Sequence, residues 1–391
     1  MSIKKKIIVK GPLLTASGYG VHSRQVLKAL LSREDVDVCV RPTEWGITSW
    51  ILDTEREDGF IQKIVELSRK PIKNILFDES YQIDIPDVWE KIAQKNIGVT
   101  AGFEADVVKK SWIDLVNKMD KVIVPSEFSK SAFLKTSKLS NIDLKSEICV
   151  INEWYYSLFD NEKVDLDYFN NLKHDQNILI IGQVTAQSTT ADRKNIFKTI
   201  RCAIDFVKDK EDIGIVLKIN GGKNSKKSDN MLKSVLREII DEKYHDKVNL
   251  ITGNLSVSEL KNLYCSKKIS CMLSGTRAEG WGLPFVESAA CGLPIIATNY
   301  SAYKEFLGND FSQVDYELIE LKIKDQRFVD FDSDSYWAEF DSKSMLFCLE
   351  DFFNNKTKFI EKAKNRQKII KQTYNQNYIL DNYKLFFKKI N

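Results

Sequence analysis

Short apolar runs alternate with amphipathic segments along most of the chain, which is the pattern of a parallel α/β protein. The apolar runs predict strands at residues 6–10, 36–40, 75–77, 97–100, 122–124, 148–151, 177–182, 213–219, 248–252, 269–273 and 295–297. Apolar residues with helical spacing predict helices over 21–31, 86–95 and 257–264. This alternation predicts open sheets covered by helices.

Residues 269–297 stand out as one complete strand–loop–helix–strand unit. A strand at 269–273 is followed by a loop with three glycines and by a helix at 283–290. Pro284 fits the first turn of that helix, and residues 292–294 (Gly-Leu-Pro) end it. Ligands of open α/β sheets bind beyond the carboxyl ends of such strands, so this loop is a candidate binding site.

Two carboxylates lie in this unit, Glu279 in the loop and Glu287 eight residues later in the helix. A carboxylate accepts hydrogen bonds from adjacent hydroxyls of a sugar or a ribose. The pair can therefore hold two parts of one ligand. The alternative is a solvated loop residue and an ordinary helix-surface residue.

The order of residues around the pair resembles a known family. Residues 279–284 (EGWGLP), then Glu287, then residues 292–297 (GLPIIA) are similar to the E-x7-E signature of retaining nucleotide-sugar glycosyltransferases. The resemblance is to family 4, the glycosyl transferases of group 1. It implies a GT-B fold, with two Rossmann-like α/β domains facing a central cleft and a C-terminal helix crossing back to the first domain.

The resemblance also implies roles for single residues. Glu279 would approach the donor sugar, and Glu287 would bind the ribose of the nucleotide. Further expected donor contacts are Gly280, Trp281, Gly282, Leu283, Gly182 and Gly253. The family usually needs no metal or other cofactor, and the donor would be a UDP-sugar or a GDP-sugar.

A basic pair follows the strand at 177–182. Lys194 matches the lysine with which the family binds the diphosphate, while Gln183 stands where the family has arginine. Arg193 is the expected substitute for that arginine. Two cations at a strand–helix junction can neutralise a phosphate as the bond between sugar and phosphate breaks.

The first half of the chain carries weaker candidates. Gly18 and Gly20 lie in a loop between the first strand and a helix, where the resembled family faces the donor phosphate. His22 is a candidate proton carrier or phosphate partner, and a structural or merely exposed residue is the alternative. The family often has a histidine after the strand at 97–100, and Glu104 is the nearest ionisable residue there.

Two tryptophans in a polar loop, Trp45 and Trp50, are acceptor-site candidates because aromatic rings stack on sugar faces. Core or rim packing is the alternative for each. The loop sequences SGYGxH and PTxWG resemble glycosyltransferase-like proteins of bacteriophages, which adds modified DNA bases to the glycans, lipids and proteins that are candidate acceptors.

Composition narrows these alternatives. The 391 residues suffice for two domains, expected at 1–160 and 161–370, with a last helix at 371–391. A net charge of +3 gives no electrostatic case for a nucleic-acid partner. Seven scattered cysteines without CxxC spacing favour reduced thiols in the cytoplasm, of the host if the protein is of phage origin. No apolar run is long enough to span a membrane.

The C-terminal segment from 356 has ten basic and two acidic residues among interspersed apolar ones. A helix that crosses back to the first domain is the main interpretation. A basic amphipathic surface that touches anionic lipid or nucleic acid is the alternative. Asp-x-Asp pairs at 35/37, 165/167 and 332/334 have the spacing of cation ligands, but none follows a predicted strand, so no metal site is expected.

The sequence thus predicts a retaining glycosyltransferase that moves a sugar from a nucleotide-sugar to an acceptor hydroxyl. A catalytically silent nucleotide-sugar-binding or assembly protein of the same fold is the alternative. A phosphorylase or a sugar-nucleotide epimerase is a third, less supported, alternative.

Overall fold

A computed structural model describes residues 4–46, 48–102, 104–161, 163–183, 192–220, 226–321 and 335–390. The chain divides into two compact units. The first holds the described residues up to Trp154, Ser335 and the last helix, α13 (Gln376–Ile390). The second holds the described residues from Tyr155 to 321 and from Tyr336 to Asn375. The predicted boundaries at 160/161 and 370/371 stay predictions.

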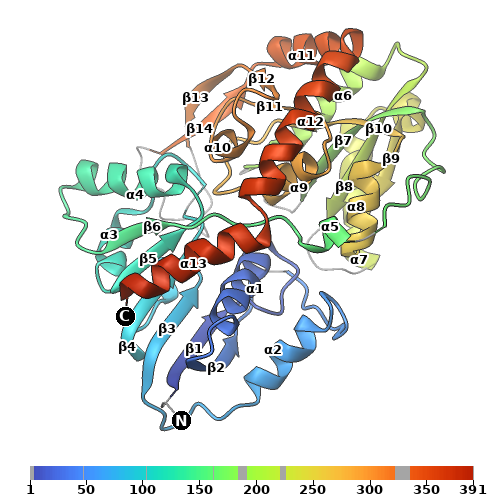
Figure 1. Cartoon of the computed structure of the whole chain (residues 1–391). Coiled ribbons are helices and arrows are strands. Elements are labelled where there is room, and N and C mark those ends of the chain that lie inside the picture. The colour runs from blue at the N-terminus through green and yellow to red at the C-terminus, as the bar shows by residue number, and fades with distance from the viewer. Residues whose placement is uncertain are drawn as a thin grey trace. The chain divides into compact units, whose positions relative to one another are not determined.

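The first unit is built on six parallel strands in the order β2-β1-β3-β4-β5-β6. The strands are β1 (Lys5–Gly11), β2 (Val36–Pro42), β3 (Phe77–Ile83), β4 (Ala93–Val99), β5 (Lys121–Val124) and β6 (Glu147–Val150). The other elements besides α13 are α1 (Gly18–Leu31), α2 (Phe60–Ser68), η1 (Pro86–Val88), α3 (Lys110–Val116) and α4 (Glu127–Ser140). Figure 1 labels the strands and α-helices of this unit.

The second unit is built on another six parallel strands, in the order β12-β11-β10-β7-β8-β9. They are β7 (Gln176–Gln183), β8 (Ile213–Asn220), β9 (Val248–Ile251), β10 (Ile269–Ser274), β11 (Ile295–Thr298) and β12 (Ser312–Val314). A separate antiparallel pair is formed by β13 (Tyr316–Glu320) and β14 (Tyr336–Phe340).

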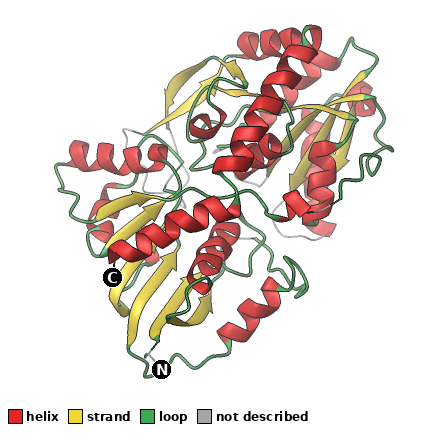
Figure 2. Ribbon diagram, in the orientation of Figure 1, coloured by secondary structure: helices red, strands yellow, loops and turns green. Residues whose placement is uncertain are grey.

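Helices of the second unit pack on this sheet or on one another, and Figure 2 shows them by secondary structure. They are α5 (Leu158–Asn161), α6 (Ile196–Val207), α7 (Lys226–Ile239), η3 (Glu242–Lys247), α8 (Val257–Cys265), α9 (Leu283–Ala290), α10 (Tyr303–Leu307), α11 (Ser342–Asn354) and α12 (Lys356–Thr373). Two apolar cores result. One centres on α6, β8 and α11, and the other on α8, α9 and α10. The prediction of two Rossmann-like α/β units is confirmed.

Two local predictions in the first unit were wrong, and a third element, the helix predicted at 21–31, is present but starts earlier. Residues 86–95 do not form a helix, because only the 3₁₀ turn η1 is helical and β4 begins at Ala93. The strand predicted at 75–77 lies later, at Phe77–Ile83, and the helix predicted from 21 begins at Gly18. Ser17 caps that helix because its side chain accepts a hydrogen bond from the Gly20 N–H, which fixes the earlier start.

The last helix, α13, belongs to the first unit and buries its apolar side there. Phe387 meets the ring of Tyr81 edge-on at 6.1 Å, and the Arg33 guanidinium lies 5.0 Å from the Phe387 ring. Tyr383 and Phe386 are buried as well. The helix thus returns the chain to the first unit, as the main interpretation predicted, and much of the apolar side that the alternative would place on a lipid surface is used in packing.

Candidate functional site

The candidate site of the second unit lies where its strand order reverses. From β7 the sheet grows through β8 and β9 to one side and through β10, β11 and β12 to the other. The neighbouring strands β7 and β10 are parallel, so their carboxyl ends lie at the same edge. Ligands of open α/β sheets bind at such a switch point. Residues 192–195 precede α6 there, and the loop 275–282 follows β10.

Glu279 lies at this edge and is only 4% exposed. Its carboxylate contacts Lys194 Nζ at 2.6 Å and Arg193 Nη1 at 3.1 Å, and it accepts a hydrogen bond of 2.9 Å from Thr276 Oγ1. Burial alone would raise the pKa of Glu279, but the charges of Lys194 and Arg193 and these hydrogen bonds lower it to about 2. The structure therefore brings three predicted site residues into one ionised cluster.

Hydrogen bonds to backbone groups hold the cluster of Glu279, Lys194 and Arg193 in place. The Glu279 N–H donates to Ser301 Oγ at 3.0 Å, and Arg193 Nη1 donates to the Ala278 carbonyl at 2.7 Å. The Arg277 N–H donates to the Arg193 carbonyl at 2.9 Å. The two bonds to Arg193 join the loop after β10 to the segment before α6, and the bond to Ser301 ties the same loop to the turn after β11. The two basic side chains and the carboxylate therefore hold one arrangement.

A second acidic group, Glu339 on β14, steadies the same segment. It accepts hydrogen bonds from Arg277 at 2.8 Å, from Lys198 at 2.6 Å and from Asn195 at 3.2 Å. Asn195 precedes α6 with a left-handed backbone (φ 51°). Sequence reasoning missed Glu339, because 144 residues separate it from Asn195 and no local pattern marks the contact.

Glu287 lies on α9 and is also 4% exposed. Its Oε2 accepts a hydrogen bond of 2.9 Å from the hydroxyl of Tyr264 on α8. Burial raises the pKa of Glu287 to about 8, and the Tyr264 hydrogen bond opposes only part of that rise. Two carboxylates of one signature therefore have opposite charge preferences.

The other predicted donor contacts have different surroundings. Gly282 precedes α9 with φ 99°, a conformation that favours glycine. The half-buried Leu283 follows it, and the buried Gly280 lies two residues before it. A Cβ on Gly182 would lie 2.2 Å from Ile196 Cδ1, so this glycine allows β7 to approach α6. The Trp281 indole is buried 4.7 Å from the Phe306 ring, so its side chain serves packing.

Gly253 has a left-handed backbone (φ 81°) and accepts a hydrogen bond of 2.7 Å from Lys218 Nζ. Lys218 also donates to Asn220 Oδ1 at 2.8 Å. It is buried in β8, and burial lowers its pKa to about 8. A buried lysine beside the expected nucleobase region is a residue that sequence reasoning missed, since it sits inside an otherwise apolar strand.

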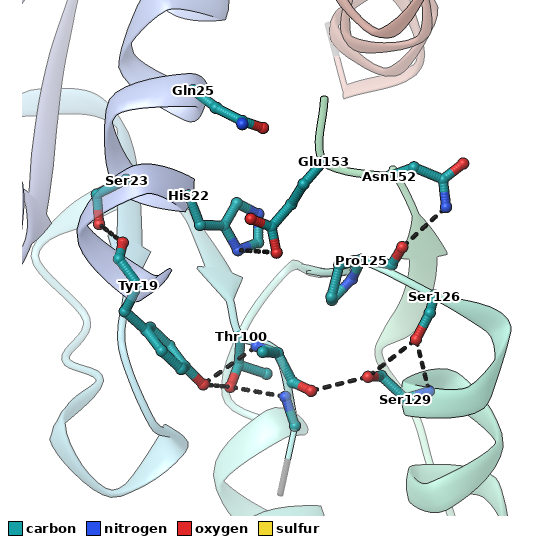
Figure 3. Close-up of polar contacts among 12 residues, drawn as sticks. Tyr19, His22, Ser23, Gln25, Thr100, Pro125, Ser126, Ser129, Asn152 and Glu153 are labelled. Atoms are coloured by element: carbon teal, nitrogen blue, oxygen red, sulfur yellow. Dashed lines mark hydrogen bonds and ion pairs between the residues drawn. The ribbon is translucent and has the colours of Figure 1, made fainter. Parts of the chain in front are cut away.

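The first unit carries its own polar cluster at the carboxyl ends of β4 and β5 (Figure 3). Tyr19 is hydrogen-bonded through its hydroxyl to Thr100 Oγ1 at 2.9 Å and accepts from the Ala101 N–H at 3.1 Å. Ser129 donates to the Ala101 carbonyl at 2.7 Å, and Ser126 caps α4 by accepting from the Ser129 N–H. Tyr19 thereby joins the glycine loop to the strand end where the family often has a histidine.

His22 points toward Glu153 in this cluster, with 3.7 Å between Nδ1 and Oε1 (Figure 3). The ring is 2% exposed, and among the described residues neither ring nitrogen has a hydrogen-bond partner. Burial lowers the pKa of His22 to about 4, so the ring is neutral at neutral pH and the contact is not an ion pair.

The remaining candidates of the first unit are spread out. Gly18 is exposed, whereas a Cβ on Gly20 would lie 2.2 Å from the Thr15 carbonyl oxygen, so close packing requires glycine there. The Trp45 ring stacks on the Tyr19 ring, with 3.8 Å between the ring centroids. The side chain of Trp50 is 41% exposed. Glu104 has a positive φ of 47°. Their expected contacts with acceptor or sugar stay predictions.

Metal and membrane features were searched over the described ranges. No group of three or more His, Cys, Asp or Glu residues that could hold a metal ion occurs within those ranges. Asp35 and Asp37 pair with Arg33 and Lys70, and residues 332 and 334 lie outside the described residues. Among the helices described, none has both the length and the apolar character needed to cross a membrane.

Comparisons with known proteins agree with this geometry. Residues 170–319 match the family model "Glycosyl transferases group 1". No curated protein matches the sequence. Sucrose-phosphate synthase from Thermosynechococcus elongatus is similar in structure, with a TM-score of 0.63, 12% identity and 99% of each chain covered.

Two further solved structures show the same fold. One is Anabaena HepE in complex with UDP-glucose, with a TM-score of 0.64, 12% identity and coverage of 98% of this chain and 99% of that one. The other is the α,α-trehalose 6-phosphate synthase of Burkholderia multivorans, with a TM-score of 0.61, 8% identity and coverage of 99% and 97%. Residues 170–319 thus match the glycosyl transferases group 1 family, the chain has the GT-B fold, and it is a glycosyltransferase.

Proposed function

We propose that the second unit binds a nucleoside diphosphate sugar and that the enzyme transfers the sugar, with retention of anomeric configuration, to an acceptor hydroxyl. The observation that carries this proposal is the meeting of Lys194, Arg193 and Glu279 at the switch point of the sheet. A diphosphate needs cations and a sugar needs a hydrogen-bond acceptor, and this cluster supplies both in one place.

Each member of the cluster receives a role in that proposal. Lys194 and Arg193 bind the diphosphate and stabilise the negative charge that grows on it as the sugar departs. In the free protein Glu279 satisfies both cations, at 2.6 and 3.1 Å. When the diphosphate takes over this pairing, the ionised carboxylate becomes available to accept hydrogen bonds from the sugar hydroxyls. Glu287 binds the ribose.

The chemistry requires positioning more than a strong base. In a retaining transfer on one face of the sugar, the departing phosphate oxygen accepts the proton of the acceptor hydroxyl. The protein then contributes by holding both reactants and stabilising the phosphate. The cationic pair, fixed through Arg277 and Glu339, suits that task, and no metal is required in this scheme.

The donor base proposed first is uracil, because HepE was solved with UDP-glucose. A GDP-sugar is the second choice. The first unit is proposed to bind the acceptor, with Trp45, Trp50, His22 and Glu104 as candidate contacts. Glycans, lipids, proteins and hydroxymethylated DNA bases all present the hydroxyl that the reaction needs, and phage origin stays a prediction.

Nucleotide binding tests the donor site. Isothermal titration with UDP, GDP and ADP should show selective binding of one of them, and binding should weaken by about tenfold or more in Lys194→Met, since one charge-assisted contact to phosphate is lost. Lys208→Met is the matched control, because Lys208 lies just past the other end of α6 and pairs only weakly with Asp205, at 3.5 Å. Equal binding by wild type and Lys194→Met would refute the diphosphate assignment.

Turnover is measured separately from binding. With the selected nucleotide-sugar, release of the nucleoside diphosphate is followed by a coupled assay, and the anomeric configuration of the product is read by proton NMR. Glu279→Gln should still bind the nucleoside diphosphate. It should release nucleoside diphosphate from the nucleotide-sugar much more slowly than the wild type does. An inverted product would refute the retaining mechanism and leave the donor site intact.

A further inference from the structure

Tyr264 is hydrogen-bonded to Glu287, but none of the roles proposed above involves this tyrosine. Tyr264 is the penultimate residue of α8, and its hydroxyl donates to Glu287 Oε2 at 2.9 Å. The tyrosine is 2% exposed and the glutamate 4%. Among the described residues, Tyr264 is the hydrogen-bond partner of this carboxyl group.

Packing of the ring alone does not explain why residue 264 carries a hydroxyl group. The Tyr264 ring belongs to the core around α8, α9 and α10, where Phe159 meets it edge-on at 6.2 Å. A phenylalanine would fill the same space. The hydroxyl brings a polar atom into that core, and burying a polar atom costs free energy unless it finds a partner. Its partner here is one oxygen of Glu287.

We propose that Tyr264 is a positioning residue of the donor site, which holds one carboxylate oxygen of Glu287 so that the other faces the ribose hydroxyls of the nucleotide. The inference rests on the proposed function of Glu287. The Glu287 side chain on α9 can rotate, so the oxygen that faces the ribose keeps its position only if the other oxygen, Oε2, is held by a hydrogen bond. The partner comes from a different helix, which ties the two helices together at the ribose.

The hydrogen bond has a second consequence. It opposes the rise in the pKa of Glu287 that burial causes, and so it favours the charged form that accepts hydrogen bonds from a ribose. Other titratable or charged groups around the pair are Lys261 and Cys265 from α8, Cys291 at the end of α9 and Lys371 from α12. All of them remain in a variant that lacks only the Tyr264 hydroxyl.

The test compares UDP binding by wild type, Tyr264→Phe and Tyr155→Phe across about pH 6 to 10, with GDP as the probe if GDP is the nucleotide that binds. Tyr155 is the matched control, because it is a buried tyrosine of the same core whose hydroxyl donates to Asp160 instead, at 2.9 Å. Tyr264→Phe should weaken binding about tenfold near neutral pH, as expected for a hydrogen bond to a charged group, and should move the pH midpoint of binding upward by about one unit. Tyr155→Phe should keep the wild-type affinity and midpoint.

A double-mutant cycle with Glu287→Gln separates the outcomes. If Tyr264 acts through Glu287, adding Tyr264→Phe to Glu287→Gln should weaken binding far less than it does alone. Wild-type affinity and midpoint in Tyr264→Phe, together with lost binding in Glu287→Gln, would overturn the positioning role and leave the ribose assignment standing. Unchanged binding in Glu287→Gln would instead refute the ribose assignment.

A near-isosteric variant guards against misfolding of Tyr264→Phe. Incorporation of 3-fluorotyrosine at position 264 keeps the ring and makes the hydroxyl a stronger donor. The pH midpoint of binding should then move downward, opposite to the effect of phenylalanine. A midpoint that stays at the wild-type value in this variant would also overturn the proposal.

Discussion

The raised pKa of Glu287 predicts that Glu287→Gln makes the protein more stable while weakening nucleotide binding. Glutamine has nearly the shape of glutamate, and its amide oxygen still accepts the Tyr264 hydrogen bond. It carries no ionisable proton. The substitution therefore removes the burial of an ionisable carboxyl group and leaves the packing of α9 unchanged.

The magnitude follows from proton linkage. The folded-state pKa of Glu287 is about 8, above its ordinary value of 4.5, so the unfolded chain gives up this proton first. The contribution of protonated Glu287 to the free energy of unfolding is fully present below about pH 4.5 and is lost as the pH rises through about 8. At about 1.4 kcal/mol per pH unit, the loss is about 3 kcal/mol at pH 7 and about 5 kcal/mol above pH 8. The Glu287→Gln variant does not lose this stability, because glutamine does not ionise.

Urea denaturation of both proteins at about pH 5, 7 and 8.5 measures the effect. The gap in unfolding free energy should be about 1 kcal/mol at pH 5 and should widen with pH. Glu279→Gln is the matched control, because the pKa of Glu279 is lowered and its loss should destabilise the protein at neutral pH. A gap between Glu287→Gln and wild type that does not change with pH would refute the reasoning.

Three further predictions concern other parts of the structure. His22→Gln should retain about 2 kcal/mol more stability than wild type at about pH 5, because the lowered pKa of the buried imidazole costs stability as the pH falls below about 6.5; urea titrations at two pH values check this. Gly275→Ala should destabilise by about 1–3 kcal/mol, because its Cβ would lie 2.4 Å from both Phe340 and Thr199; its thermal midpoint checks this, and an unchanged midpoint would contradict it. Glu339→Gln should raise the donor KM more than it lowers kcat, since it loosens the segment that carries the basic pair; steady-state kinetics check this.

The resemblance to a known family supplied the prediction that Glu279, Lys194 and Arg193 serve one donor site. The structure adds the reason that they meet, because Glu279 and Lys194 follow two neighbouring parallel strands whose carboxyl ends share an edge. Tyr264, Lys218 and Glu339 could not be found in this way. Each reaches its partner through tertiary packing, and a tyrosine or lysine inside an apolar segment carries no sign of what it will contact.

The failure at residues 86–95 has a different physical cause. Apolar residues at 88, 89 and 92 have helical spacing, yet the chain turns once in η1 and then extends into β4. Trp89 lies against Gly98 of β4, where a Cβ would come within 2.5 Å of the indole. Tertiary packing of one large ring on a strand thus overrides the local periodicity.

The two glutamates of the signature differ in charge preference, which suits the two different parts of a donor that they are proposed to bind. Both are buried to the same extent, so burial penalises both charges alike. Two cations more than offset that penalty at Glu279, whereas a single tyrosine hydroxyl does not at Glu287. Environments that push apart the pKa values of like groups are typical of functional sites. Glu279 is therefore charged at neutral pH, whereas Glu287 is mostly neutral there. If Glu287 binds the ribose as proposed, the ribose hydroxyls add hydrogen bonds that favour its charged form, so donor binding should release a proton at neutral pH.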